Sequence, residues 1–469
     1  MFLWLQKRFI KIHPLFILIS VSSLILFLAS SIKHILYQST AFDLGFFDQA
    51  IYLISVNLPP IVSFNNIHIL GDHAALIFYP ISLLYKLYPS VYWLFAIQAI
   101  ALSMGALPAY YLAQESNLTP KQCLAIAIVY LLYPLVFNVN LFDFHPDVIA
   151  LPALLWAVLS ARQQKLGQFI GAIAIILSCK AVLSLTVAFL GIWLLLHQKT
   201  RRYGLIALIA GAAWFGIATQ LIIPHFRTQE LAGISRYSFL GNSVSEIIIN
   251  LILKPQLVLS YLFTGVNFGY LLLLCIPLLW GLSWRHLDPL IPALPALFLN
   301  LLSDYDGQKD LLTQYSLPVF PFLLLAVIAA LADGKTLIRR PRWIMLWSLV
   351  SFFALAKGGF FTSRYLSSLD TWQATNAAIA QIQTQGGVLT SAEIAPHVTH
   401  RPLVKMATDG SETLDFNQFE YVLLNKRHPG WQSSPELIDQ LIRKIEKNAN
   451  FQKIYFQDDV SLFSNTLLK

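Results

Sequence analysis

The sequence has little charge for its length. Only 12% of its 469 residues are Asp, Glu, Lys or Arg, whereas 57% are hydrophobic and the mean hydropathy is +0.62. A soluble domain carries roughly 25% charged residues, and half that share leaves too little polar surface to cover a globule of this size. The composition therefore excludes a disordered chain and argues against a soluble enzyme. It predicts an α-helical polytopic membrane protein.

Cysteine is also scarce, and several familiar motifs are missing. Cys123, Cys179 and Cys275 lie in apolar runs and form no spaced set, so we expect neither a disulfide framework nor a Cys-based zinc site. The chain has no Walker A motif, which argues against ATP-driven pumping, and it has no HExxH or GxSxG motif. The net charge of +8 reflects loop topology in a membrane protein, and no nucleic-acid partner is expected.

The composition changes near residue 360. Residues 1–358 hold 22 Lys/Arg and 13 Asp/Glu, whereas residues 359–469 hold 10 and 11. The first part predicts a transmembrane helical domain with a long first outer loop (33–90), and the second predicts a small soluble α/β domain. A spanning helix needs about 20 apolar residues. On that basis we expect about eleven spans: 14–32, 91–113, 122–138, 147–161, 166–179, 181–197, 204–223, 268–284, 288–302, 315–332 and 342–358.

Two of these assignments remain open. Residues 166–197 also fit one long helix. The apolar segment 70–88 is interrupted by His73 and Lys86, so we place it in the membrane interface, although it is long enough to span.

The basic residues predict the orientation of the chain. If the N-terminal Lys7, Arg8 and Lys11 are cytoplasmic, 14 of the 22 Lys/Arg before the tail fall in inner loops, as the positive-inside rule requires. An odd number of spans then places the C-terminal domain on the extracytoplasmic side of the plasma (inner) membrane. Most acids fall on that outer side as well, and membrane insertion does not require this.

The last 110 residues contain strand and helix signals. GGVLTS and FEYVLLN are rich in apolar and β-branched residues and predict strands. SSPELIDQLIRKIEKN begins with a helix-start signal and continues with apolar residues at helical spacing. FQKIYFQDDVSLFSN predicts a hairpin around Asp458-Asp459.

Two acids lie among apolar residues in the first outer loop. Asp43 and Asp48 are five residues apart in AFDLGFFDQAIYLI, which places them roughly 140° apart on a helix. A carboxylate beside a bilayer is costly unless it is hydrated or paired, so both are candidates for function. The alternative is a carboxylate that caps a short amphipathic helix, which suits Asp48 well.

The same loop continues to His68 and Gly71-Asp72-His73. An Asp beside a His can orient the imidazole or contribute to a metal site. Two adjacent side chains are weak evidence for a metal, and an Asp at a helix start explains Asp72 equally simply.

A third acidic stretch, NLFDFHPDVIALP, follows in the next outer loop. Asp143, His145 and Asp147 cluster there around Pro146. Helix-start chemistry explains Asp147 well. It does not explain His145, which we expect to contact a polar partner.

Several cations are candidates for a phosphate. Lys180 lies inside the apolar stretch IILSCKAVLSL, where a buried lysine needs an anion or a polar cavity. It could instead extend to the outer interface, which is also where a lipid phosphate lies. Arg227 and Arg236 are further candidates, and the polar outer loop 304–315 is either part of a site or only a solvated connection.

These segments together resemble the DUF2079 family of predicted prokaryotic membrane proteins. The matching strings are FDLGFFDQA, GDHAALIFYP, P..YWLFAIQAIALSMGALPAY, LFDFHPDVIALP, IIPHF and NLLSDYDGQKDLLTQYSLPV, followed in the tail by SAEIAPHVTHRPLV and EYVLL. The combination of FDLGFFDQ, GDH and FDFHP is specific, whereas each string alone would be weak. The family often has Lys-Glu-Asp where this chain has Lys180-Ala181-Val182, and the loss of both acids implies altered or reduced activity if they assist the chemistry in relatives.

The family is similar in architecture to GT-C membrane glycosyltransferases, which take sugars from polyprenyl phosphate. This similarity implies transfer from a polyprenyl-phosphate-linked sugar at the outer bilayer surface to an acceptor glycan, lipid or protein. The first-loop acid corresponds to Asp43 as general base, and less surely to Asp48. The implied substrate contacts are Gln49, Asp72, His73, His145, Lys180 and Arg227, and Asp72 and His73 are the candidates for a divalent cation if one is used.

Two other functions use the same features. A transporter or a non-enzymatic protein that binds lipid-linked glycans would also have a polar outer cavity, but a transporter predicts polar residues midway through several spans. Gln98 and Lys180 are the main ones. An assembly factor would need only one span as an anchor, so eleven would be excessive.

Overall fold

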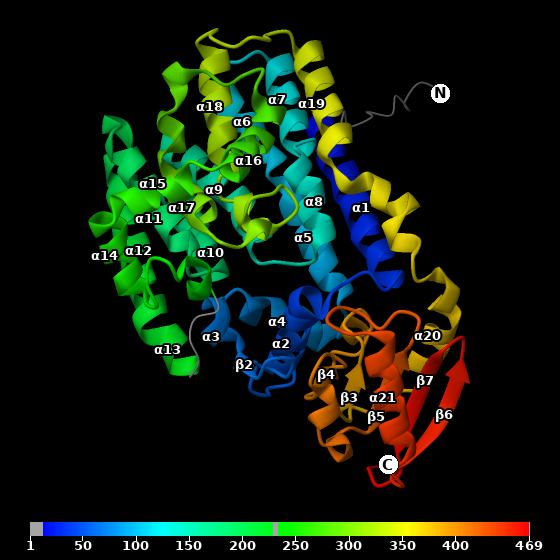
Figure 1. Cartoon of the computed structure of the whole chain (residues 1–469). Helices are drawn as coiled ribbons and strands as arrows, with labels where there is room; N and C mark the ends of the chain where they lie inside the picture. The colour runs from blue at the N-terminus through cyan, green and yellow to red at the C-terminus, as the bar shows by residue number, and fades with distance from the viewer. Residues whose placement is uncertain (1–12, 228–232, 469) are drawn as a thin grey trace, which may run out of the picture.

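The computed structural model describes residues 13–227 and 233–468, which form a large helical part and a smaller part built on a β-sheet (Figure 1). The sheet lies at one end of the helical part, next to the segments that follow the first helix. Four charged residues used in the topology prediction, Lys7, Arg8, Lys11 and Glu230, lie outside the described residues.

Helix α1 (Pro14–Ile35) starts at a proline whose missing N–H suits the first helical turn. Two pairs of shorter helices follow the first outer segment: α5 (Tyr92–Met104) with α6 (Ala106–Glu115), and α7 (Pro120–Leu131) with α8 (Pro134–Phe142). Gly105 separates α5 from α6, and a Cβ there would lie 2.0 Å from the Tyr130 hydroxyl of α7. Only glycine allows this close approach of the two segments.

The two helices expected over 166–179 and 181–197 are both present, and the alternative of one long helix over 166–197 is wrong. Helix α9 (Asp147–Arg162) is followed by α10 (Leu166–Cys179) and α11 (Leu183–Leu195). The chain breaks at Lys180, whose backbone is extended. The lysine therefore lies at the end of a helix and not in the middle of a span.

Helix α12 (Arg201–Ile217) packs closely against α11 through glycines. The remaining helices of this part are α13 (Ile223–Phe226), α14 (Val244–Leu253), α15 (Pro255–Leu262), α16 (Gly265–Cys275), α17 (Leu294–Leu302), α18 (Phe320–Ala332) and α19 (Pro341–Leu355).

The expected number of eleven spans is not confirmed. By length and composition, the described residues contain four helices that could cross a membrane, or up to six if each of two bent pairs is one crossing. Five more apolar helices have only 10–17 residues. Prolines and breaks such as the one at Lys180 divide apolar runs that composition alone presents as continuous.

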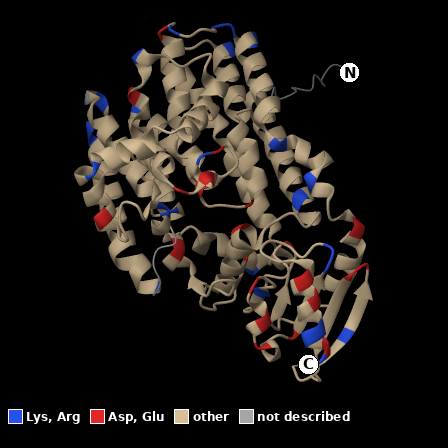
Figure 2. Ribbon diagram, in the orientation of Figure 1, with Lys and Arg blue, Asp and Glu red and all other residues tan. Residues whose placement is uncertain are grey.

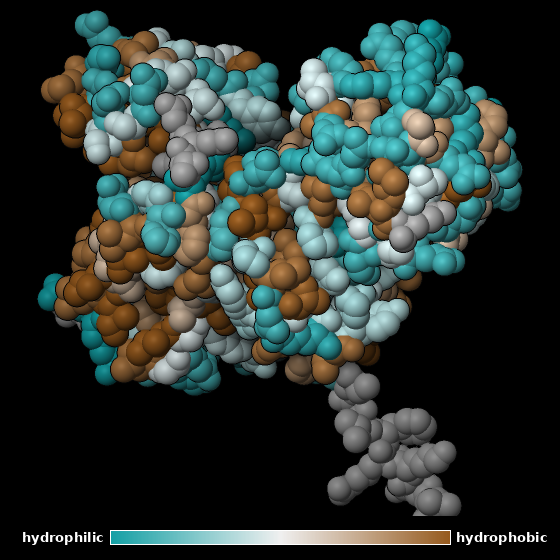
Figure 3. Space-filling model, turned by 90° about the horizontal axis from the view of Figure 1, so that it is seen from below, coloured by the Kyte–Doolittle hydropathy of each residue, from teal (hydrophilic) through white to brown (hydrophobic). Residues whose placement is uncertain are grey.

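The surface of the helical part is apolar. Many large hydrophobic side chains on its helices are exposed, among them Leu24, Ile209, Leu221, Phe268 and Phe353. In Figure 3 hydrophobic residues gather over the helical part, whereas the sheet part is mainly hydrophilic. Charged residues are likewise sparse on the helices and frequent around the sheet (Figure 2). This division fits a protein whose helices contact lipid and whose sheet part contacts water.

The first outer segment folds into short elements between α1 and α5. They are the π-helical turn η1 (Ala41–Gly45), α2 (Phe46–Ser55), β1 (Ile61–Val62), β2 (Ile67–His68), α3 (Ile69–His73) and α4 (Phe78–Leu87). The segment 70–88 is therefore two short helices with a break between them. Neither is long enough to cross a bilayer.

The C-terminal sheet has five strands in the order β4-β3-β5-β7-β6. Its elements are α20 (Trp372–Ile379), β3 (Val388–Thr390), β4 (Val404–Met406), β5 (Tyr421–Asn425), α21 (Pro435–Glu446), β6 (Phe451–Gln457) and β7 (Val460–Asn465). β3 pairs in parallel with β4 and β5, and β7 is antiparallel to β5 and β6.

Most elements of this C-terminal part were predicted from the sequence. The two predicted strands are β3 and β5, the predicted helix is α21 with Ser434 as its cap, and the predicted hairpin is β6–β7. Asp458 and Asp459 have φ values of 48° and 61°, which a two-residue hairpin turn requires. Strand β4 was not predicted, because three residues are too few for a sequence pattern to stand out.

Candidate functional site

A contact between Asp43 and His145 defines the centre of the site. Asp43 lies in η1 and keeps 26% of its side chain exposed, whereas His145, after α8, is almost buried. The His145 Nε2 atom is 3.3 Å from Asp43 Oδ1. Residues about 100 positions apart in the sequence thus form an acid–imidazole pair with one open side.

A buried ion pair is connected to the Asp43–His145 contact through Thr40. Lys33, near the end of α1, lies 2.6 Å from Asp143 Oδ1, and both side chains are buried. Thr40 links the two acids, since its backbone N–H donates to Asp143 Oδ2 (3.0 Å) and its hydroxyl donates to Asp43 Oδ2 (2.8 Å). Asp143 has φ 96° and ψ 172°, a conformation that is strained for any residue except glycine and recurs at functional sites.

These contacts determine the protonation of Asp43. Burial alone would raise the pKa of its carboxyl, but the hydrogen bond and charge interaction with His145, together with Thr40 and Lys33, lower that pKa below its usual value. Asp43 is therefore an ionised acceptor at neutral pH.

Phe47 connects this pair to the next histidine. Its ring centroid lies 5.4 Å from that of His145 and 6.2 Å from that of His73. The GDH and FDFHP stretches therefore lie on two sides of one aromatic ring from α2.

Asp72 and His73 meet a cation from a distant segment. Asp72 Oδ2 is 3.1 Å from His73 Nδ1, and Asp72 Oδ1 is 3.7 Å from Arg227 Nη1. Gly71 permits this approach, because a Cβ there would lie 2.7 Å from the Phe226 carbonyl oxygen. The Arg227 Nε atom is buried and has no hydrogen-bond partner among the described residues. Burial lowers the pKa of His73 despite the neighbouring Asp72, which favours its neutral form.

Lys180 lies beside the same histidine. The N–H of Ala181 donates to the His73 carbonyl (2.9 Å), and the Lys180 Nζ atom is 3.5 Å from Asp147 Oδ2. Its ammonium also lies 5.7 Å from the Tyr315 ring centroid, and Arg236 lies over the same ring at 5.2 Å. The outer loop 304–315 is thus part of the site's surroundings and more than a solvated connection.

We call this set the outer cluster. It comprises Asp43, Asp72, His73, Asp143, His145, Asp147, Lys180 and Arg227. No three His, Cys, Asp or Glu side chains within residues 13–227 and 233–468 are grouped so that they could hold a metal ion. Asp72 and His73 remain a pair, and Asp72 faces Arg227 on its other oxygen.

Asp48 and Gln49 make their contacts elsewhere. Asp48 accepts hydrogen bonds from the hydroxyls of Tyr85 (2.5 Å) and Thr399, and its carboxylate is 3.1 Å from His400 Nε2. Gln49 Nε2 donates to the Arg401 carbonyl (3.0 Å). Both side chains therefore join α2 to the segment between β3 and β4 and do not contact Asp43.

Sequence reasoning missed several residues that matter here. Lys33 was placed at the start of the first outer loop without a role, and Thr40, Phe47 and His400 were not singled out at all. The only signal for Lys33 was a cation beside a span end close to the acidic loop. His400 lies in the APHVTHRPLV string, which contributed to the family resemblance. Nothing in this string indicated a chemical role for the histidine.

A family model described as "Predicted membrane protein (DUF2079)" matches residues 33–462. The chain belongs to the DUF2079 family. The matched region begins at Lys33, includes every residue of the outer cluster and ends within β7, the last strand of the sheet. Comparison with curated proteins finds no match.

Two solved structures resemble this DUF2079 chain over nearly its full length. ArnT from Cupriavidus metallidurans bound to undecaprenyl phosphate has 11% identity and a TM-score of 0.55, with 96% of this chain and 98% of that chain covered. The apo state of the same ArnT has 10% identity and a TM-score of 0.53, with 97% and 98% covered. At this identity the likeness concerns the fold, and the fold is that of a polytopic membrane protein.

Proposed function

We propose that the chain is a membrane glycosyltransferase that moves a sugar from a polyprenyl-phosphate donor to an acceptor at the extracytoplasmic face. The observation that carries the proposal is the partly exposed, ionised Asp43 carboxylate held by His145 and Thr40 in a cluster that also contains cations. The fold likeness to an ArnT that binds undecaprenyl phosphate supports a lipid phosphate as the donor's leaving group.

Asp43 acts as the general base. It accepts the proton of the acceptor hydroxyl while that oxygen forms a bond to the anomeric carbon of the sugar. The bond between this carbon and the phosphate oxygen breaks in the same step, and the lipid phosphate leaves with the electron pair. His145 holds the carboxylate in position through its Nε2 atom, and Thr40 holds the other oxygen.

Lys180 and Arg227 receive the phosphate. Their distances to Asp147 and Asp72, 3.5 and 3.7 Å, are long for ion pairs between charged groups. The unpartnered Nε atom of Arg227 provides a further donor. Fixed cations of this kind stabilise the charge that develops on the departing phosphate.

The orientation follows from the same proposal. We place the N-terminus in the cytoplasm and the outer cluster and C-terminal sheet on the extracytoplasmic side of the inner membrane. Lys335, Arg339, Arg340 and Arg342 flank the connection between α18 and α19, and Figure 2 draws cations at this end of the helices, opposite the sheet. A cytoplasmic location for them satisfies the positive-inside rule.

The polar residues inside the helical part favour this function over transport. The Gln98 amide donates to the Asn140 carbonyl (2.9 Å), and Asn140 donates to the Leu26 carbonyl (2.8 Å). Asn138 likewise donates to the Leu311 carbonyl (3.0 Å). These side chains are engaged with the backbone of neighbouring segments, where they hold the helical part together.

The test is sugar transfer by the purified chain and its Asp43→Asn variant. The assay follows transfer from polyprenyl-phosphate sugars to lipid and glycan extracts. We expect a loss of transfer of about 10²–10⁴-fold, with donor binding retained because the phosphate contacts are unchanged. Asp304→Asn, an exposed outer acid, is the matched control. Full transfer by Asp43→Asn would remove Asp43 as the base, and donor binding without any transfer by the wild type would favour a binding protein.

A further inference from the structure

A polar cavity, separate from the outer cluster, lies between the end of α1 and the C-terminal sheet. Its volume is about 310 Å³, within the range of roughly 300–1,000 Å³ that is usual for small-molecule sites. Its walls come from the segments after α1, before α20, after β3 and after β5. Hydroxyl and amide side chains are frequent among them, including Tyr37, Gln38, Ser368, Thr375, Ser391 and Asn425.

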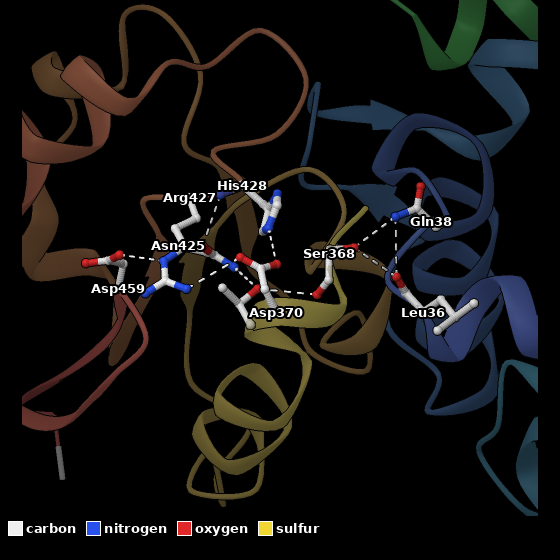
Figure 4. Close-up of polar contacts among 9 residues, drawn as sticks. Leu36, Gln38, Ser368, Asp370, Asn425, Arg427, His428 and Asp459 are labelled. Carbon is white, nitrogen blue, oxygen red and sulfur yellow. Dashed lines mark hydrogen bonds and ion pairs between the residues drawn. The ribbon is translucent and has the colours of Figure 1, made fainter. Parts of the chain in front are cut away.

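The cations of this cavity are already paired. Arg427 Nε donates to Asp459 Oδ2 (2.7 Å), and its Nη1 atom is 3.5 Å from Asp370. His428 Nε2 is 2.7 Å from the other oxygen of Asp370. Figure 4 shows these side chains converging from three segments of the chain, with Gln38 and Ser368 on the opposite side. Among the described residues that line the cavity, no cation is thus left over for a phosphate, and a neutral polar ligand fits better.

One carboxylate oxygen in the wall lacks a donor. Glu393 Oε1 accepts a hydrogen bond from the backbone N–H of Trp431 (3.1 Å), whereas Oε2 is buried and has no partner among the described residues. Gly430 makes room for Oε2, since its φ is +92° and a Cβ there would lie 2.2 Å from this oxygen. A buried acceptor without a donor is unfavourable. A ligand hydroxyl would satisfy it.

Aromatic rings connect this cavity to the candidate base. The Trp431 side chain is 50% exposed, and its ring centroid lies 5.3 Å from that of Phe42, the residue before Asp43. Gln38 lines the cavity only five residues before Asp43, a chain length that extends over about 17 Å at most. A molecule anchored in the cavity can therefore present a neighbouring group to Asp43.

We propose that this cavity binds one sugar residue of the acceptor glycan. The hydroxyls of the sugar donate to Glu393 Oε2 and accept hydrogen bonds from the hydroxyl and amide groups of the wall. Trp431 directly follows Gly430, the last lining residue of the cavity, and is half exposed, so the apolar face of the ring packs on it at the edge of the cavity. The binding of a sugar stands on the cavity itself, and only its role as the acceptor rests on the proposed function.

The test measures sugar binding by the full chain in lipid nanodiscs. The probes are the methyl glycosides of glucose, galactose and N-acetylglucosamine, followed by saturation-transfer NMR. We expect at least one glycoside to bind the wild type and Glu393→Gln to weaken that binding about tenfold, because a charged acceptor is lost. Trp431→Ala keeps the backbone N–H that donates to Glu393 Oε1. It should weaken binding as well, because the ring that packs against the sugar is lost. Glu436→Gln, an exposed acid on α21, should leave it unchanged.

The outcomes separate the two proposals. Absence of binding by all three glycosides, equal affinity of Glu393→Gln and the wild type, or displacement of the glycoside by inorganic phosphate would each overturn the sugar site. Asp43→Asn should bind the glycosides normally while it loses transfer. If it binds them and retains transfer, the proposed base is wrong and the sugar site stands.

Discussion

The Nε2 atom of His145 lies 3.3 Å from the Oδ1 atom of Asp43, so the loop after α8 holds the carboxylate of the first outer segment. The contact lowers the pKa of Asp43 against the effect of burial. It leaves part of the carboxylate open, which is what a general base that must meet a substrate requires. A positioning residue of this kind acts through the acid and not on the substrate.

Replacement of His145 should change the pH dependence of transfer. In His145→Ala the pKa of Asp43 rises, because the hydrogen bond that favours the charged form is lost. A base must be ionised, so the acidic limb of the kcat/KM profile should move to higher pH. His286→Ala, a histidine that contacts Asp333 elsewhere, serves as the control. An unmoved limb would show that His145 does not position Asp43.

Removal of only one partner of the buried Lys33–Asp143 pair should destabilise the protein. Lys33→Met leaves a buried carboxylate without its cation, which typically destabilises a protein by about 3–5 kcal/mol. Adding Asp143→Asn should recover a large part of the lost Tm, because no buried charge then remains. Thermal unfolding of both single variants and the double variant in detergent measures this. Purely additive losses would argue against direct coupling.

The contact between Asp48 and His400 should make the attachment of the sheet depend on pH. Burial alone would lower the pKa of His400, but the Asp48 carboxylate raises it above its usual value. The contact is therefore at full strength below the usual His pKa of about 6.5 and weakens as the pH rises through the raised value. The hydrogen-exchange protection factors of residues 399–406, which are corrected for the intrinsic rise of exchange with pH, should fall over this interval in the wild type. His400→Gln should abolish this fall.

Lys180 should affect the donor more than the acceptor. Lys180→Met removes a cation proposed to bind the phosphate and should raise the KM for the donor by roughly 10–100-fold, whereas the acceptor KM changes little. Lys180→Arg should restore part of the loss, because it keeps the charge. Lys165→Met, at the other end of α10 and exposed, is the control. A change confined to the acceptor would contradict the phosphate role.

Local signals were sufficient for the C-terminal elements. Ser434 before Pro435, the continuous apolar run of β5 and the Asp458-Asp459 turn each act over a few residues, so their structure is visible in the sequence. Local signals could not decide whether residues 166–197 form one long helix or two helices. Lys180 ends the helix because its side chain and the following N–H find partners on α9 and α3.

The composition of the sequence by itself determined that this is a membrane protein, since lipid selects apolar residues and water selects polar residues wherever they are in the chain. Only the tertiary structure decided which polar residues work together. It joined Asp43 to His145 and Lys33 to Asp143, and it turned Asp48 and Gln49 towards the sheet. Such partnerships depend on the packing of segments 100 to 350 residues apart, and no local pattern encodes them.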